Sequence, residues 1–164
     1  MLLKRKYVVK SEWSIVKNIL VSGGAGYVGS HTVKVLLEEG FNVVVLDNLT
    51  TGSVQAVAPK AKFFYGDIGN RLFVDRVLQD EQIEAAIHFA AFSVVSDSIK
   101  RPDDYFQENV AKTNSFITAL VKAGIDKLIL SSTASVYGIP VDTTVSEDSS
   151  NQTHQPLWAF QANG

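Results

Sequence analysis

Short apolar runs alternate along the chain with segments whose apolar residues recur at helical spacing. The apolar runs lie at 17–23, 42–47, 61–67, 84–91 and 127–132. Each run is short, mostly apolar and followed by glycine or polar residues, which predicts a strand buried on both faces. Helical spacing predicts three helices: one from the glycines after the first run to Gly40, one around Leu72, Phe73, Val77 and Leu78, and one from Pro102 to Ala123.

This alternation predicts a parallel sheet, because each crossover helix must pack back on the sheet. The expected fold class is α/β, a doubly wound sheet of about five strands that is incomplete at its C-terminal side. Residues 1–15 are interpreted as an extension before the domain, with an added edge strand at 6–10 as an alternative. The domain itself covers 16–138, and the polar segment 139–164 is expected to be irregular, without a sixth strand.

Composition narrows the class of protein. The chain has 164 residues, 46% of them hydrophobic, and 15 basic against 17 acidic side chains give a net charge of -2. No long basic block or apolar span indicates a nucleic-acid or membrane partner. Because there is no cysteine, a disulfide scaffold is excluded and the cytoplasm is the expected compartment. His31, His88 and His154 have no ligand spacing, so no metal site is expected, and His31 and His88 are interpreted as structural.

Three glycines separate the first predicted strand from the first predicted helix. Gly23, Gly26 and Gly29 follow one another at three-residue spacing. Without a Cβ, the first can make a sharp turn, the second lets the backbone approach a pyrophosphate, and the third lets the helix lie close to the strand. The helix N-terminus would then offer N–H groups to the anion. The pattern predicts a dinucleotide-binding, Rossmann-like loop.

Two aspartates follow the next two predicted strands. Asp47 lies 24 residues after Gly23, where a carboxylate binds a ribose diol and repels a 2′-phosphate. This position favours NAD over NADP, and the alternative is a glycine turn with a capping aspartate. Asp67 ends the third strand, where it either accepts a hydrogen bond from an adenine amino group beside Ile68 or caps the next helix.

The combined motifs resemble the extended short-chain dehydrogenase/reductase family and, within it, the UDP-glucose 4-epimerases. The motifs are VSGGAGYVGSH, VVVLDNLTTG, GDI, AAIHFAA, ENV and LILSSTASVYG, in this order between residues 17 and 138. The resemblance implies bound NAD, a UDP-sugar substrate and exchange of UDP-galactose with UDP-glucose through a 4-keto intermediate. It also implies a homodimer through the helical face around Tyr105 and Phe106. Separately, the unpaired edge of the fifth predicted strand is expected to favour self-association or aggregation.

The resemblance also implies roles for individual residues. Thr133 matches the family's catalytic Ser/Thr. The implied cofactor contacts, together with those argued above, are Gly23, Gly26, Tyr27, Val28, Gly29, Asp47, Asn48, Leu49, Thr50, Thr51, Asp67, Ile68, Phe89, Ala90, Ala91, Asn109 and Ser131. Ser93 stands where these epimerases commonly have a lysine that reaches the cofactor.

The catalytic base of the family has no counterpart. The family uses a tyrosine with a lysine four residues later, which lowers the phenol pKa. Residues 7, 27, 65, 105 and 137 are tyrosines, and none has lysine at that distance. After Pro156, Leu157 stands for the tyrosine and Gln161 for the lysine. We expect an inactive NAD-binding portion from a truncated or frameshifted reading frame. The alternatives are a non-catalytic nucleotide-binding or partner-binding module, and an oxidoreductase that uses Tyr137 as its base.

Overall fold

A five-stranded parallel sheet forms the centre of the computed structural model, which describes residues 16–137 and 145–146. The strands are β1 (Asn18–Ser22), β2 (Asn42–Asp47), β3 (Lys62–Tyr65), β4 (Ala85–His88) and β5 (Leu128–Leu130). Their order is β3-β2-β1-β4-β5, and every pair is parallel. The predicted doubly wound α/β class with about five strands is therefore confirmed.

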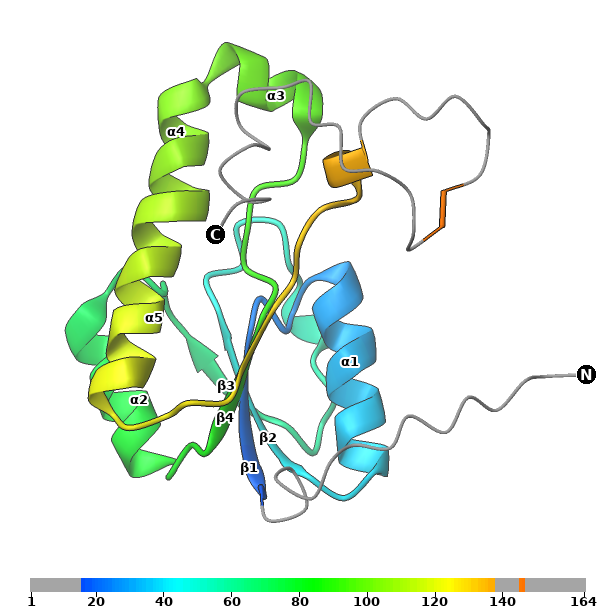
Figure 1. Cartoon of the computed structure of the whole chain (residues 1–164). Helices are drawn as coiled ribbons and strands as arrows, with labels where there is room; N and C mark the ends of the chain where they lie inside the picture. Colours follow the sequence, from blue (N-terminus) through cyan, green and yellow to red (C-terminus); the bar gives the residue numbers. More distant parts are fainter. Residues whose placement is uncertain (1–15, 138–144, 147–164) are drawn as a thin grey trace, which may run out of the picture.

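Helices cover both faces of the sheet (Figure 1). On one face lies α1 (Tyr27–Glu38), and on the other lie α2 (Arg71–Asp80) and α5 (Lys112–Lys122). Adjacent residues of β1 enter opposite cores: Leu20 packs with the side chains of α2 and α5, whereas Ile19 and Val21 pack with Val33 of α1. This two-sided burial explains why the strands are apolar throughout instead of alternating.

The long predicted helix is present but not uniform. It consists of α4 (Pro102–Phe106), a π-helical segment at Gln107–Ala111 and α5, with helical dihedral angles at both junctions. A short helix, α3 (Val95–Lys100), precedes it and was not predicted. The other additions are two 3-10 turns at Val54–Ala56 and Ala134–Tyr137.

The strand boundaries correct four predictions. The first strand, predicted at 17–23, is Asn18–Ser22. The fourth strand ends at His88 and not at residue 91, so Phe89, Ala90 and Ala91 leave the sheet. The third and fifth strands are likewise shorter than predicted, and β5 is an edge strand with Ile129 and Leu130 about half exposed. The predicted extension 1–15 lies outside the described residues, and so does the predicted irregular segment 139–164 except for residues 145–146.

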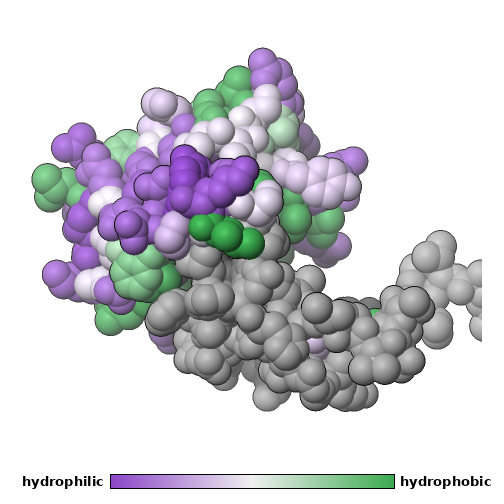
Figure 2. All heavy atoms as spheres, turned by 90° about the horizontal axis from the view of Figure 1, so that it is seen from above, coloured by the Kyte–Doolittle hydropathy of each residue, from purple (hydrophilic) through white to green (hydrophobic). Residues whose placement is uncertain are grey.

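The outer surface at one end of the molecule is predominantly hydrophilic. Seen from above, hydrophilic residues cover much of the described surface, with smaller hydrophobic areas between them (Figure 2). Within the described residues, no helix has the length and apolar character needed to cross a membrane.

Candidate functional site

A groove crosses the carboxyl ends of the strands where β1 lies between β2 and β4. Chain connections reverse direction at this point, which is where open α/β sheets bind their ligands. The groove has a small pocket of about 80 Å³ on the β2–β3 side and a larger one of about 470 Å³ on the β4–β5 side. Both pockets are lined by Gly23, Gly26, Thr51, Phe89, Ala91 and Phe92. The glycine loop is therefore the floor that the two pockets share.

The three glycines each meet a different steric requirement. Gly23 has φ +74°, and a Cβ there would lie 2.6 Å from the backbone nitrogen of Ala90. A Cβ on Gly29 would lie 2.1 Å from the carbonyl oxygen of Gly23, so only glycine lets α1 approach the loop this closely. At Gly26 the nearest atom would be the same oxygen, at 3.3 Å. The protein fills the space beside Gly23 and Gly29, whereas Gly26 faces the open groove.

Asp47 is buried and ties the glycine loop to the end of β2. Its Oδ2 accepts a hydrogen bond from the backbone N–H of Ala25 at 2.9 Å, and its Oδ1 accepts one from Leu49 at 2.8 Å. Leu49 adopts a φ of +57° in this turn. A carboxylate has about four acceptor positions, so two remain for a ligand.

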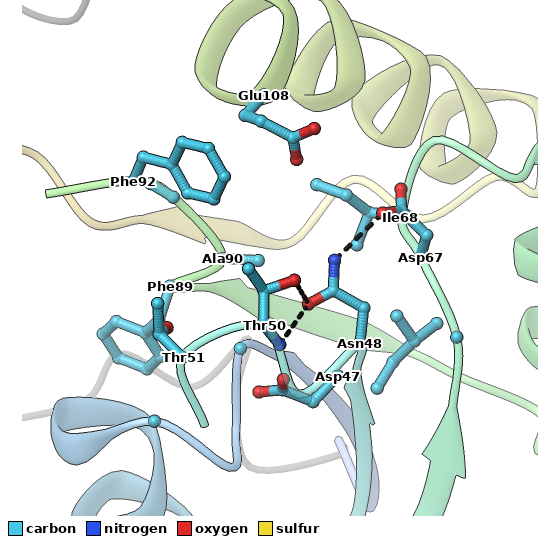
Figure 3. Close-up of a pocket in the computed structure, with 15 residues that line it drawn as sticks. Asp47, Asn48, Thr50, Thr51, Asp67, Ile68, Phe89, Ala90, Phe92 and Glu108 are labelled. Atoms are coloured by element: carbon cyan, nitrogen blue, oxygen red, sulfur yellow. Dashed lines mark hydrogen bonds between the residues drawn. The ribbon is translucent and has the colours of Figure 1, made fainter. Parts of the chain in front are cut away.

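Asp67, in the loop between β3 and α2, accepts hydrogen bonds from this loop and from the loop after β2. Its Oδ1 accepts from the backbone N–H of Gly69 at 2.8 Å, and its Oδ2 accepts from Asn48 Nδ2 at 3.0 Å (Figure 3). The helix-capping alternative for Asp67 is wrong, because the N-cap of α2 is Asn70, whose side chain accepts from Phe73 N–H at 3.2 Å. Asp67 instead faces the small pocket with Ile68 beside it.

Lys112 forms an ion-pair network with Asp67 and Glu108. Its Nζ donates to Asp67 Oδ2 at 2.8 Å and to Glu108 Oε2 at 2.8 Å. Burial raises the pKa of Asp67, but hydrogen bonds from Lys112, Gly69 and Asn48 outweigh it and hold this pKa below its ordinary value. Burial lowers the pKa of Lys112, and the hydrogen bonds to both carboxylates outweigh it and raise that pKa. Asp67 and Lys112 are therefore both charged at neutral pH.

Asn109, in the π segment, binds the loop that follows β4. Its Oδ1 accepts from Phe92 N–H at 2.7 Å, and its Nδ2 donates to Phe92 O at 2.9 Å. Phe92 also packs edge-on against Tyr105, whose hydroxyl donates to Val94 O at 2.7 Å. Tyr105 is therefore buried within the domain and does not belong to an exposed helical face, whereas Phe106 is about half exposed.

His88 is buried at the end of β4, with both ring nitrogens bonded. Its Nδ1 lies 2.6 Å from Ser22 Oγ and its Nε2 lies 2.9 Å from Thr113 Oγ1. Burial lowers its pKa to about 4, so the ring is neutral at physiological pH. The interpretation of His88 as a structural histidine is consistent with these bonds, although the ring also lines the large pocket. His31 is held similarly, with Nδ1 2.8 Å from Tyr27 O.

Comparison with known proteins identifies the family. The family model described as the NAD dependent epimerase/dehydratase family matches residues 19–163. The chain belongs to this family. Among curated relatives, it is 48% identical over 130 residues to the UDP-glucose 4-epimerase of Lactobacillus helveticus. The aligned residues make up 79% of this chain and 39% of that protein. The Lacticaseibacillus casei UDP-glucose 4-epimerase is 48% identical over 129 residues, with the same coverage. The chain thus spans about two fifths of these relatives' length.

Solved structures of the family agree with the fold. The UDP-glucose 4-epimerase of Brucella ovis in complex with NAD superposes with a TM-score of 0.80 and 34% identity, over 88% of this chain and 44% of that chain. The Thermus thermophilus enzyme in complex with NAD has a TM-score of 0.80 and 33% identity, over 88% of this chain and 47% of that chain. The domain described here corresponds to part of these family members.

The residues predicted from the family resemblance converge on the groove, with one exception. The small pocket collects Asp47, Asn48, Thr50, Asp67, Ile68 and Ala90, and the large pocket collects Tyr27, Val28, Gly29, Asn109, Ser131 and Thr133. Leu49 lines neither pocket; it contributes its backbone N–H to Asp47. The prediction missed Phe92 and Glu108, which belong to no glycine or strand motif. The spacing of Glu108 and Lys112, four residues apart on a helix, was an available signal.

The catalytic positions of the epimerase family are only partly described. Thr133 lines the large pocket, as does Ser93, where relatives were expected to have lysine. Leu157 and Gln161 lie outside the described residues. Tyr137 does not line either pocket, whereas Tyr27 lines the large one and its ring packs against His31 at 4.9 Å. Within the described residues, the alternative that uses Tyr137 as a base therefore lacks support from either pocket.

Proposed function

We propose that the chain binds NAD across the groove, with the adenosine half in the small pocket and the nicotinamide half in the large one. The observation that carries this proposal is Asp47. Its two remaining acceptor positions match the two hydroxyl donors of an unphosphorylated ribose. A 2′-phosphate would instead meet a pocket lined by the carboxylates of Asp47, Asp67 and Glu108.

The diphosphate would lie over Gly26, at the start of α1. The space that Gly26 leaves open adjoins the first turn of a twelve-residue helix. Its N-terminal N–H groups and dipole favour an anion. Tyr27 and Val28 would contribute their backbone N–H groups, since both residues line the large pocket.

The nicotinamide half would extend toward β5. Ser131 and Thr133 line this pocket together with the neutral ring of His88. Bound NAD supplies the capacity to accept a hydride from a substrate and to return it. The residues described here would bind and orient this half of the cofactor.

We further propose that this 164-residue chain alone does not interconvert UDP-galactose and UDP-glucose. That reaction is suggested by the relatives named UDP-glucose 4-epimerase, of which the chain spans 39%. General-base catalysis contributes about 10²- to 10⁴-fold, and no tyrosine in this sequence is followed by lysine four residues later. Tyr27, the phenol at the groove, is followed at that distance by His31.

Calorimetric titration and a turnover assay test both parts. The purified chain should bind NAD, should bind NADP at least about tenfold more weakly, and should leave UDP-galactose unconverted in the presence of NAD. Absence of NAD binding at millimolar concentration would overturn the cofactor assignment. Conversion above the rate of a boiled control would overturn the proposed inactivity while leaving the cofactor assignment intact.

A further inference from the structure

The charged side chains that line the small pocket are all carboxylates. They are Asp47, Asp67 and Glu108, and within the part of the chain described here no lysine or arginine lines this pocket. A pocket of this kind offers hydrogen-bond acceptors and lacks cationic donors. It therefore fits a ligand whose facing groups are N–H or O–H donors.

Lys112 contacts two of these lining carboxylates but does not itself line the pocket. Its Nζ lies 2.7 Å from Glu108 Oε1 and 2.8 Å from Asp67 Oδ2, yet Lys112 does not line the pocket. The three side chains are only 19–31% exposed. The ammonium thus compensates two carboxylates that would otherwise repel each other, and it fixes their orientation.

The three carboxylates differ in how much acceptor capacity remains. Asp67 already accepts from Gly69, Asn48 and Lys112, which occupies about three of its four acceptor positions. Asp47 accepts two backbone N–H groups. Within the described residues, the carboxylate of Glu108 bonds to Lys112 alone. Lys112 contacts both oxygens of Glu108, so about two acceptor positions remain there, as they do on Asp47. Because the two on Asp47 are assigned to the ribose, Glu108 is the carboxylate with the most capacity left for the base.

The walls beside Glu108 suit a flat heterocycle. Glu108 extends from the helix toward the space between Phe92 and Ile68, while Asn48 and Thr50 lie on the opposite side of that space (Figure 3). Phe92 is held there by both amide atoms of Asn109. An aromatic ring between these apolar side chains would present one edge to the Glu108 carboxylate.

We propose that Glu108 determines base specificity at this pocket by accepting a hydrogen bond from the 6-amino group of adenine, the role that the sequence suggested for Asp67, with Lys112 as its positioning residue. Asp67 has about one acceptor position left and would lie beside the same amino group. This inference rests on the proposed binding of NAD. A 6-oxo purine presents a carbonyl oxygen at the same place, where it would face Glu108 and Asp67. Loss of a hydrogen bond to a charged group, combined with this repulsion, corresponds to about tenfold or more in affinity.

The test compares NAD with nicotinamide hypoxanthine dinucleotide, which differs from NAD at the 6-position of the purine. Calorimetry on the full chain should give at least about tenfold tighter binding of NAD. In Glu108→Gln this ratio should fall to about twofold or less, because the amide can donate to the 6-oxo group. Glu81→Gln is the matched control, since Glu81 pairs with Lys62 away from the groove, and it should keep the wild-type ratio.

The outcomes separate this inference from the proposed function. If the wild-type chain does not bind NAD, both fail. If it binds NAD but Glu108→Gln keeps the wild-type ratio, only the specificity role is overturned. Should Glu108→Gln fold poorly, judged by its melting temperature, Glu108→Ala serves as the second variant and should lower the ratio in the same way.

Lys112→Met examines the positioning role separately. Without the ammonium, the carboxylates of Glu108 and Asp67 repel each other, and the ratio should fall at least about threefold. Lys112→Arg should restore most of it. A purely structural role would lower stability without changing the ratio, and that result would overturn the assignment of Lys112. Lys62→Met is the control, because it removes an ion pair of the same type elsewhere.

Discussion

Gly26 and Gly29 belong to the same loop, yet substitution by alanine should reduce stability much more at Gly29 than at Gly26. At Gly29 the added Cβ would lie 2.1 Å from Gly23 O and 2.8 Å from Gly24 Cα, both backbone atoms that cannot rotate away. Overpacking typically costs about 1–3 kcal/mol, and displacement of backbone places this site at the upper part of that range. For a domain of this size, about 2–3 kcal/mol corresponds to a fall in melting temperature of roughly 4–12 °C.

At Gly26 the φ is -79°, which alanine adopts without strain, but the new Cβ would lie 3.3 Å from Gly23 O, so the loop must shift by a few tenths of an ångström. Alanine reduces the entropy of the unfolded chain, worth about 0.4–1 kcal/mol, but is a poorer N-cap than glycine by a similar amount. The two terms nearly cancel, so any fall in melting temperature comes from the 3.3 Å contact and should be smaller than in Gly29→Ala, where the contact is 2.1 Å. The new methyl group would occupy the space proposed for the diphosphate, so NAD affinity should fall at least about tenfold.

Differential scanning calorimetry and NAD titration of both variants measure these effects side by side. Gly29→Ala should lose stability and binding together, and Gly26→Ala should lose binding with a smaller loss of stability. An unchanged melting temperature for Gly29→Ala would refute the close approach of α1 to the loop. Wild-type NAD affinity in Gly26→Ala would refute the placement of the diphosphate.

Three further predictions concern charged or titrating groups. Asp47→Asn should weaken NAD binding about tenfold and narrow its advantage over NADP, measured by titration with both cofactors; Asp80→Asn, at the end of α2, is the control. The pKa of His88 is lowered from 6.5 to about 4, so its contribution to stability is complete above pH 6.5 and is lost as the pH falls toward 4. This contribution amounts to roughly 3 kcal/mol, and in urea unfolding His88→Gln should show a shallower decline than wild type across this interval. The pKa of Asp67 is lowered in the folded state, so its contribution to stability is present above pH 3.8 and is lost as the pH falls through the folded pKa. The pKa of Lys112 is raised, so its contribution is present below pH 10.5 and is lost as the pH rises through the folded pKa. Lys112→Met should therefore lower the free energy of unfolding at pH 7 and have less effect at pH 3, and an equal effect at both would contradict the ion pair.

The sheet could be predicted because its signal is local. The apolar runs that became β1, β2 and β4 are buried on both faces, so burial leaves a direct mark on the sequence. The glycine loop is similar, because the backbone at Gly23 and the contact at Gly29 exclude other residues. Each of these features depends on a few neighbouring positions.

The missed features depend on distant partners. From the sequence, Asp67 fitted two roles equally well, adenine binding and helix capping. The structure adds its ion pair with Lys112, 45 positions away, and shows that Asn70 caps the helix instead. Phe92 faces the groove because Asn109 bonds to its backbone, and no spacing rule joins these residues.

The Asn109 amide has a consequence for how the groove responds to change. It bonds both the N–H and the carbonyl of Phe92, and Phe92 borders the small and the large pocket alike. One side chain therefore sets the width of two compartments that would hold chemically different halves of a ligand. Loss of these two hydrogen bonds would let Phe92 move and would change the shape of both pockets. A substitution at Asn109 therefore cannot alter one pocket without altering the other.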